Sequence, residues 1–156
     1  MSIKSIQVIS LNPFFTSKII QSFLTGYGKE KVDLSLLYLV LPFIMFKESR
    51  DVLSSANKKS SIYSLYYKNL NKRTALINFN RKYERMKGLT NESLIVASNE
   101  EAINLEEKIT LLKELHYQSE KDKYIKKYYK AAYYLGVILS KVSYIEVYRK
   151  LGVVYI

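Results

Sequence analysis

Apolar residues recur at helical spacing along most of the chain, and the clearest case lies toward its C-terminal end. Tyr124, Tyr128 and Ala131 begin a series of apolar residues separated by alternating steps of four and three. This spacing places side chains on one face of a helix, and lysines occupy the other face. The pattern predicts a long amphipathic helix over residues 119–141, about 35 Å in length.

Capping residues and helix breakers divide the rest of the chain into shorter helices. Asn12 before Pro13 is typical of a helix start, because Asn caps the first turn and proline suits the first helical position. Residues 34–46 are apolar on nearly every side and predict a buried helix, too short for the roughly 20 residues that cross a bilayer. The predicted helices comprise residues 13–25, 34–46, 47–56, 61–70, 71–87, 91–101, 119–141 and 143–151.

The middle of the chain shows the order of elements found in a winged helix. Three predicted helices, of which Gly88 separates the second from the third, precede a segment near 103–112 that alternates apolar and polar residues around Glu106-Glu107. Such alternation predicts a two-stranded hairpin. We therefore expect a mostly α, compact single domain. Its parts are an apolar helical part over 1–56, a winged-helix-like part over 57–112 and C-terminal helices over 113–156.

The composition excludes most familiar classes of enzyme active site. The 156 residues include no Cys and a single His, His116, which excludes disulfides, thiolate zinc sites, cysteine nucleophiles and multi-histidine metal sites. No nucleophile elbow surrounds the three aspartates that could complete a triad with His116. We expect no catalysis and no cofactor; a small enzyme that uses surface carboxylates remains an alternative. We also expect no signal peptide and a cytoplasmic protein.

Charge is the most informative property of the composition. The net charge is +11, yet residues 57–87 contain nine Lys and Arg against one Glu, whereas residues 88–107 contain five Glu and no base. A second basic segment begins the helix predicted over 119–141. Localised cations of this kind predict contact with a DNA backbone; the alternative is a solvated helix face. The candidate DNA-binding residues are Lys58, Lys59, Lys68, Lys72, Arg73, Arg81, Lys82, Arg85, Lys87, Lys123, Lys126, Lys127 and Lys130.

Two further features limit what kind of binding we expect. The helix predicted over 91–101 would be the recognition helix of a winged helix, but it carries Glu and no base, which is unsuited to reading base edges in the major groove. Most of the 15 tyrosines lie at helical spacing with Leu and Ile, which favours packing over base stacking. The apolar C-terminal tail, Val153, Val154, Tyr155 and Ile156, is a candidate contact with a partner protein.

Several stretches, in their order along the chain, together resemble a known family. They are Asn12-Pro13, Gly26-Tyr27, LLYLVLPFIMFKESRDVL at 36–53, LTNESL at 89–94, KAAYYLGVILSK at 130–141 and KLGV at 150–153. This set is similar to the middle component of bacterial three-component ABC systems, a group that overlaps the Lamassu defence systems. The chain departs from the family pattern at Phe46, where histidine is usual, and at Val154-Tyr155, where an arginine-proline ending is usual.

The resemblance implies a non-catalytic subunit that is assembled with an SMC-like ABC ATPase and an effector, often a nuclease. In such systems the ATPase is thought to sense foreign or aberrant DNA and to release the effector. The middle component would then bridge these two partners and could contact double-stranded DNA without sequence preference. The competing hypothesis is a stand-alone DNA-binding regulator with a winged helix.

Overall fold

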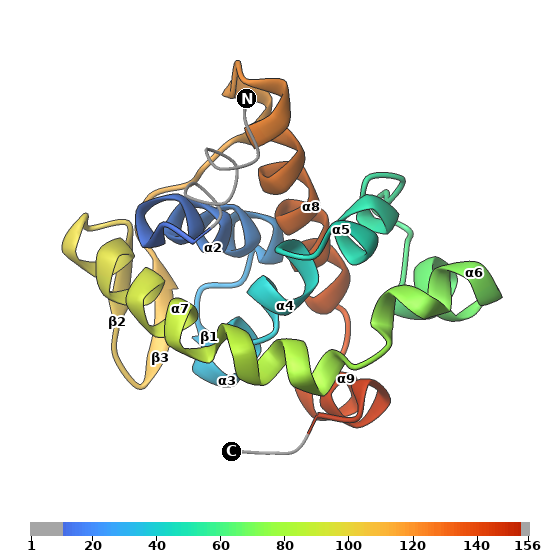
Figure 1. Cartoon of the computed structure of the whole chain (residues 1–156). Helices are drawn as coiled ribbons and strands as arrows, with labels where there is room; N and C mark the ends of the chain where they lie inside the picture. The colour runs from blue at the N-terminus through green and yellow to red at the C-terminus, as the bar shows by residue number, and fades with distance from the viewer. Residues whose placement is uncertain (1–10, 154–156) are drawn as a thin grey trace.

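Helix α2 (Pro13–Tyr27) lies at the centre of the fold, where the two longest helices, α7 (Phe79–Asn99) and α8 (Lys123–Leu139), pack against it (Figure 1). The structure is a computed structural model that describes residues 11–153. The start of α2 is as predicted, because the Asn12 side chain accepts a hydrogen bond from the Phe14 amide at 2.9 Å and Pro13 follows it. The helix continues through Gly26 and ends at Gly28, which has a φ of 69°.

Small residues bring the backbones of α2 and α8 into direct contact. A Cβ atom placed on Gly26 would lie 1.9 Å from the Tyr133 carbonyl oxygen, and one placed on Gly136 would lie 2.1 Å from the Phe23 carbonyl oxygen. Ser22 Oγ, one turn before Gly26, donates to the Tyr129 carbonyl oxygen at 2.6 Å. These residues therefore set how closely the two helices approach.

The predicted helix over 34–46 is wrong, although its residues are largely buried as expected. The structure has two short helices there, α3 (Leu34–Leu37) and α4 (Val40–Ile44), followed by α5 (Lys47–Leu53). Pro42 explains the break, because proline has no amide proton for the carbonyl four residues earlier and its ring collides with that carbonyl.

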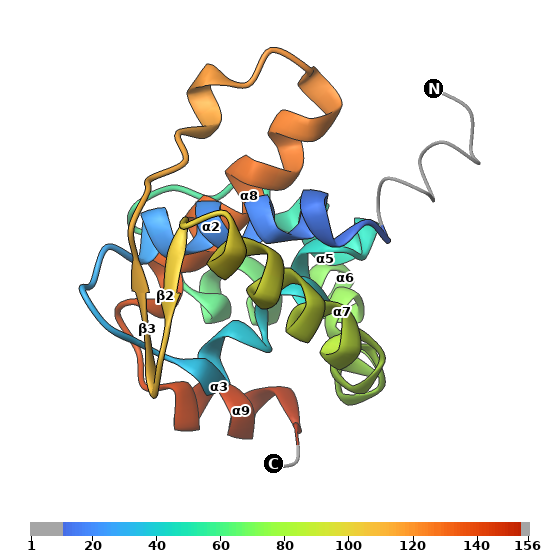
Figure 2. The same ribbon diagram turned by 90° about the vertical axis from the view of Figure 1, so that its left-hand side faces the viewer.

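A three-stranded antiparallel sheet covers one edge of the helices, and Figure 2 shows two of its strands side by side there. The predicted hairpin is confirmed as β2 (Ile103–Leu105) and β3 (Lys108–Leu111). The short strand β1 (Val32–Asp33), which the sequence analysis missed, pairs with the other side of β3. Its two residues are too few for an alternating pattern to reveal.

The winged-helix-like unit is not confirmed. Helix α7 runs from Phe79 through Gly88 to Asn99, so the separate helices predicted over 71–87 and 91–101 are wrong. Thr90 and Ser93, near the predicted break, are buried along α7, and Ser93 Oγ forms a hydrogen bond with Thr16 Oγ1 of α2. Between α5 and α7 the chain forms three short elements. They are a π-helical turn η1 (Tyr63–Tyr67), helix α6 (Leu70–Arg73) and a 3-10 turn η2 (Thr74–Leu76).

The C-terminal elements are close to their predicted positions. After a 3-10 turn, η3 (Tyr117–Ser119), the Asp122 side chain caps α8 by accepting from the Tyr124 amide at 2.8 Å. Helix α9 (Tyr144–Leu151) ends at Gly152 in a left-handed conformation. The mostly helical fold class is thus confirmed. Within residues 11–153 no helix has the length and apolar character needed to cross a membrane.

Candidate nucleic-acid interface

Two predicted DNA-binding residues on the first half of α7 meet the start of α5 around one aromatic ring. Lys82 Nζ lies 4.8 Å from the centre of the Phe46 ring, and Arg85 Cζ lies 6.0 Å from it. Phe46 immediately precedes α5, whose first residue is the exposed Lys47. The amphipathic pattern of the sequence is confirmed here, because Tyr83 and Met86 face the core while Arg85 faces solvent. Lys82 and Arg85 of α7 and Lys47 of α5 therefore lie on the same part of the surface.

A cleft between α5 and α8 gathers a further basic and aromatic group. We name it the α5–α8 cleft; it has a volume of about 290 Å³. The Arg50 guanidinium lies 4.1 Å from the centre of the Tyr128 ring and donates to the Ile44 carbonyl oxygen at 2.9 Å. Lys47 is ion-paired with Asp51, and Arg50 and Lys127 leave the cleft with a net positive charge that favours an anion. Its lining residues are Lys47, Arg50, Asp51, Ser54, Tyr124, Lys127 and Tyr128.

The Tyr124 hydroxyl does not add negative charge to the cleft. Burial and a hydrogen bond with Tyr128 raise the pKa of Tyr124 to about 12, although the Arg50 guanidinium acts in the opposite direction. The two hydroxyl oxygens lie 3.0 Å apart. The Tyr124 hydroxyl is therefore protonated at neutral pH and does not repel a phosphate.

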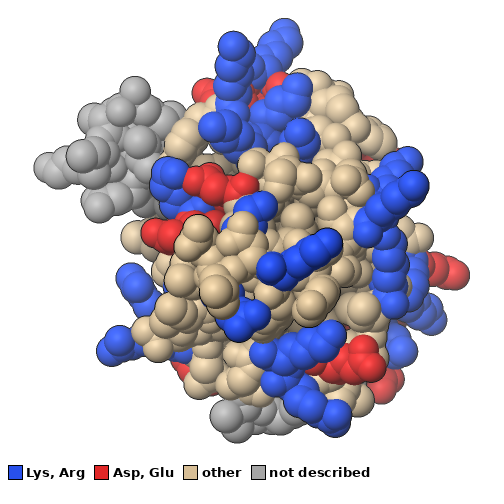
Figure 3. All heavy atoms as spheres, turned by 90° about the vertical axis from the view of Figure 1, so that its right-hand side faces the viewer, with Lys and Arg blue, Asp and Glu red and all other residues tan. Residues whose placement is uncertain are grey.

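The other predicted cations are divided among separate parts of the surface. Lys58 lies near the C-terminal end of α8, where its carbonyl oxygen accepts a hydrogen bond from Lys141 Nζ. Arg73 of α6 donates to the Tyr67 carbonyl oxygen at 2.8 Å. Lys87 forms an ion pair with Glu84 at 3.2 Å. Figure 3 shows Lys and Arg in several groups separated by uncharged surface, with one group at the top, over the start of α8. The remaining predicted cations, all exposed or half-buried, are Lys59, Lys68, Lys72, Arg81, Lys123, Lys126 and Lys130.

Comparison with known proteins decides the family. A family model described as ABC-three component (ABC-3C) system Middle Component 3 matches residues 2–155. The chain belongs to this family. Searches of curated proteins and of solved structures each found no match.

A Middle Component 3 protein is an accessory component of an ABC-three component system and is distinct from its ATPase. Its surface here is consistent with a binding role. Among the residues that the structure describes, no three His, Asp or Glu side chains are arranged to hold a metal ion. The lone His116 is exposed, and its Nε2 lies 3.2 Å from a Glu114 carboxylate oxygen.

The predicted partner tail of this Middle Component 3 protein needs one correction. Val153 is only 7% exposed and packs with the chain's own core, so its side chain is not an available contact surface. Its amide donates to the Tyr148 carbonyl oxygen at 3.1 Å, which anchors it just after α9. Val154, Tyr155 and Ile156 lie outside the described residues.

Sequence reasoning missed the contribution of α5 to the basic surface of this Middle Component 3 protein. Lys47 and Arg50 alternate with Glu48 and Asp51, so the local net charge is near zero and conceals them. Tyr128, on which Arg50 packs, comes 78 residues later, a separation that no local pattern bridges. The one available signal was the unusual Phe46 within a stretch that otherwise follows the family pattern.

Proposed function

We propose that this Middle Component 3 protein is a non-catalytic adaptor in a defence system of the Lamassu type. In this proposal it binds an SMC-like ABC ATPase and an effector nuclease, and it contacts the backbone of double-stranded DNA. Family membership supports the accessory role. The basic surface around the starts of α7 and α8 supports the DNA contact.

The main observation in support of the proposed DNA contact is the position of the cations within these helices. Arg81 and Lys82 lie in the first turn or so of α7, and Lys123 and Lys126 lie in the corresponding part of α8. The first turn of α7 contains no acidic residue, whereas the start of α8 is already capped by the Asp122 carboxylate. The start of a helix is the positive end of its dipole, where a cation is disfavoured and a phosphate is favoured. At the start of α7, an anionic partner would offset the repulsion between the helix dipole and the nearby cations.

The same geometry argues for contact without sequence reading. Phe46 and Tyr128 are already covered by cations from this chain, so these rings are not free to stack on bases. Lysines and arginines that reach phosphates fix orientation but carry no sequence information. The stand-alone regulator loses its structural basis, because the helix it would use for recognition is a continuation of α7.

Charge reversal at the start of α7 tests the DNA contact. In the complex of this chain with its co-expressed partner components, the double variant Arg81→Glu with Arg85→Glu should weaken duplex binding about tenfold. It should also reduce the slope of log affinity against log salt by about one per lost phosphate contact. Fluorescence anisotropy with a labelled duplex at several salt concentrations measures both quantities.

The matched control reverses the same number of charges near the sheet, at Lys31 and Lys113. Both residues are exposed and lie next to β1 and β3, away from the starts of α7 and α8. This control should lose little affinity. Equal losses in the two double variants would mean that only net charge matters, and the proposed DNA surface would be wrong.

Co-expression with the products of the adjacent genes tests the adaptor role. We expect the chain to co-elute with the ATPase on size-exclusion chromatography, because a bridging subunit must remain attached to it. The measurement is made at low and at moderate salt, since a purely electrostatic association weakens as salt rises. Elution as a separate species under both conditions contradicts the adaptor role.

A further inference from the structure

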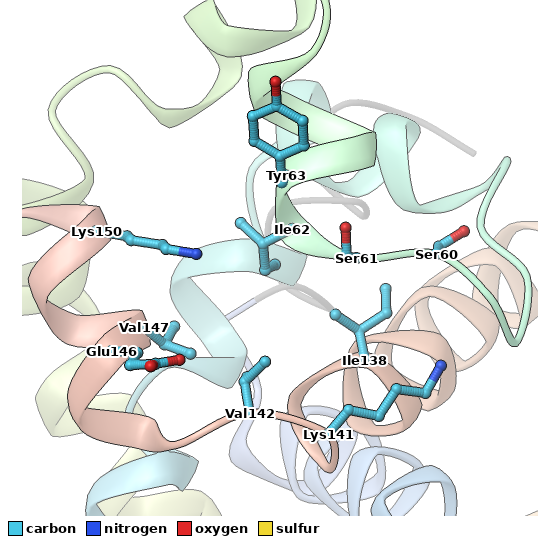
Figure 4. Close-up of a pocket in the computed structure, with 10 residues that line it drawn as sticks. All are labelled: Ser60, Ser61, Ile62, Tyr63, Ile138, Lys141, Val142, Glu146, Val147 and Lys150. Atoms are coloured by element: carbon cyan, nitrogen blue, oxygen red, sulfur yellow. The ribbon is translucent and has the colours of Figure 1, made fainter.

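The face at the C-terminal end of α8 carries a groove that the proposed DNA contact does not use. We name it the α8–α9 groove; it has a volume of about 190 Å³ and lies between the segment that leads into η1, the end of α8 and helix α9. Figure 4 shows Ile62, Ile138, Val142 and Val147 directed toward one another across the hollow. Its lining is therefore mainly aliphatic, which favours apolar side chains over phosphates.

Exposed apolar surface lies in the groove and beside it. Tyr63 and Val142, which line the groove, are 62% and 38% exposed, and Ile145 of α9 is 45% exposed. A second hollow is lined by Tyr63, Tyr67, Arg73 and Lys150 and thus shares Tyr63 and Lys150 with the first. The two hollows together form an elongated depression, the shape that an extended or helical peptide requires.

The walls of this depression are held in place by hydrogen bonds between distant parts of the chain. The Tyr67 hydroxyl donates to the Lys150 carbonyl oxygen at 3.0 Å, which ties η1 to α9. Lys141 Nζ donates to the Lys58 carbonyl oxygen, which ties the end of α8 to the loop before η1. A site whose walls are fixed before binding loses less conformational entropy when a partner docks.

Charge identifies the kind of partner that fits. Lys141, Lys150 and Arg73 border the depression, and Glu146 is the one carboxylate among its lining residues, all of which the structure describes. In Figure 4 Lys141 lies at the side of the hollow and Lys150 extends from α9 toward Ile62, while the aliphatic side chains form the interior. An aliphatic interior with a basic border is complementary to apolar side chains flanked by Asp or Glu.

We propose that the α8–α9 groove binds an acidic amphipathic segment of another protein component of the system. The inference rests on the proposed function, because it requires a partner protein, and it adds where that partner docks and what its docking segment contains. The groove lies toward the opposite end of α8 from the α5–α8 cleft; Tyr128 of the cleft and Ile138 of the groove are about 15 Å apart along the helix. A protein at one end and DNA at the other can therefore be bound at the same time.

Site-specific photo-crosslinking in the assembled complex tests the proposal. A benzoylphenylalanine is placed at Tyr63, the complex is irradiated, and the cross-linked peptide is identified by mass spectrometry. We expect a cross-link to another protein component, at a segment in which Asp or Glu flank large apolar residues. The same residue introduced at Ile95, which is 55% exposed on α7, is the matched control and should not give this product.

Two substitutions test whether the cross-link depends on the lining of the groove. Val142→Glu places a carboxylate beside the aliphatic interior, and Lys150→Glu reverses the border charge while leaving the backbone carbonyl that Tyr67 uses. Each should reduce the cross-link from Tyr63 at least tenfold, whereas Ile95→Glu should not. Circular dichroism of each purified variant confirms folding; Lys150→Glu is the variant with no buried contact to lose.

The remaining outcomes separate failure of this inference from failure of the proposed function. A complex that assembles but shows no cross-link from Tyr63, or a cross-link that neither substitution weakens, overturns the inference alone. A cross-link to DNA, or to a second copy of this chain, also overturns it, because the groove then serves a different partner. Failure of the complex to form overturns both the inference and the adaptor role.

Discussion

Replacing Gly26 by alanine is expected to lower the free energy of unfolding by about 3 kcal/mol or more, at the upper end of what overpacking costs. The new methyl group would lie 1.9 Å from the Tyr133 carbonyl oxygen, and the atoms it meets belong to the α8 backbone, which cannot rotate away as a side chain can. Gly136→Ala meets the Phe23 carbonyl oxygen at 2.1 Å and should be equally damaging. Urea denaturation followed by circular dichroism measures both effects.

Gly88→Ala is the matched control for this prediction. Gly88 lies inside α7, and a Cβ placed there has no atom within 4 Å. Alanine is the better helix former, so this variant should gain about 0.5–1 kcal/mol. A Gly26→Ala protein with an unchanged unfolding midpoint would show that α2 and α8 do not approach as closely as described.

A steep loss of stability above pH 10 is the second large effect that we expect. Burial raises the pKa of Tyr66 well above its ordinary value of 10, and burial, with a smaller effect from Glu120, raises the pKa of Tyr129 to about 12. Below pH 10 the folded and unfolded chains both keep these protons. Between pH 10 and 12 the unfolded chain releases them first, so ionisation favours unfolding.

Each unit of pKa difference corresponds to about 1.4 kcal/mol of stability that is lost once the pH has risen through the folded value. Urea midpoints measured at pH 8, 10 and 11 should fall steeply over the last interval. Tyr66→Phe removes one ionising group and should make this decline shallower, although it loses the hydrogen bond of the hydroxyl to the Ser49 carbonyl oxygen and is less stable at pH 8. An identical decline in the variant would contradict the assignment to Tyr66.

Elements whose causes are local were predictable from the sequence. The start of α2 follows from Asn12-Pro13, the end of α9 from Gly152, and the buried face of α8 from the spacing of its apolar residues. The hairpin was also found, because alternation over 103–111 is a property of neighbouring residues. In each case the side chains that form the structure lie within a few residues of one another.

The errors arose where contacts between distant segments outweighed local preference. Gly88 was taken to end a helix, but α7 continues through it, because residues beyond it are buried against α2 and stabilise the helix there. The helix predicted over 13–25 also continues through Gly26, which admits the backbone of α8. Neither partner is visible in the sequence near these glycines.

The candidate site was predictable only in part, for the same reason. The cations of α7 and α8 were identified from local charge, yet their meeting with Phe46 and the α5–α8 cleft depends on packing between elements. Arg50 lies against Tyr128 because α5 crosses α8, and counting charges along the chain does not reveal this contact. The sequence therefore indicated the candidate residues but not how they are grouped.

The backbone contact between α2 and α8 has a mechanical consequence. Because Gly26 and Gly136 leave no clearance, sliding or rolling of one helix over the other would drive a Cβ or larger side chain into the opposing backbone. We therefore expect the two helices to move as one rigid unit. The α5–α8 cleft and the α8–α9 groove, which lie toward opposite ends of α8, therefore keep a fixed separation.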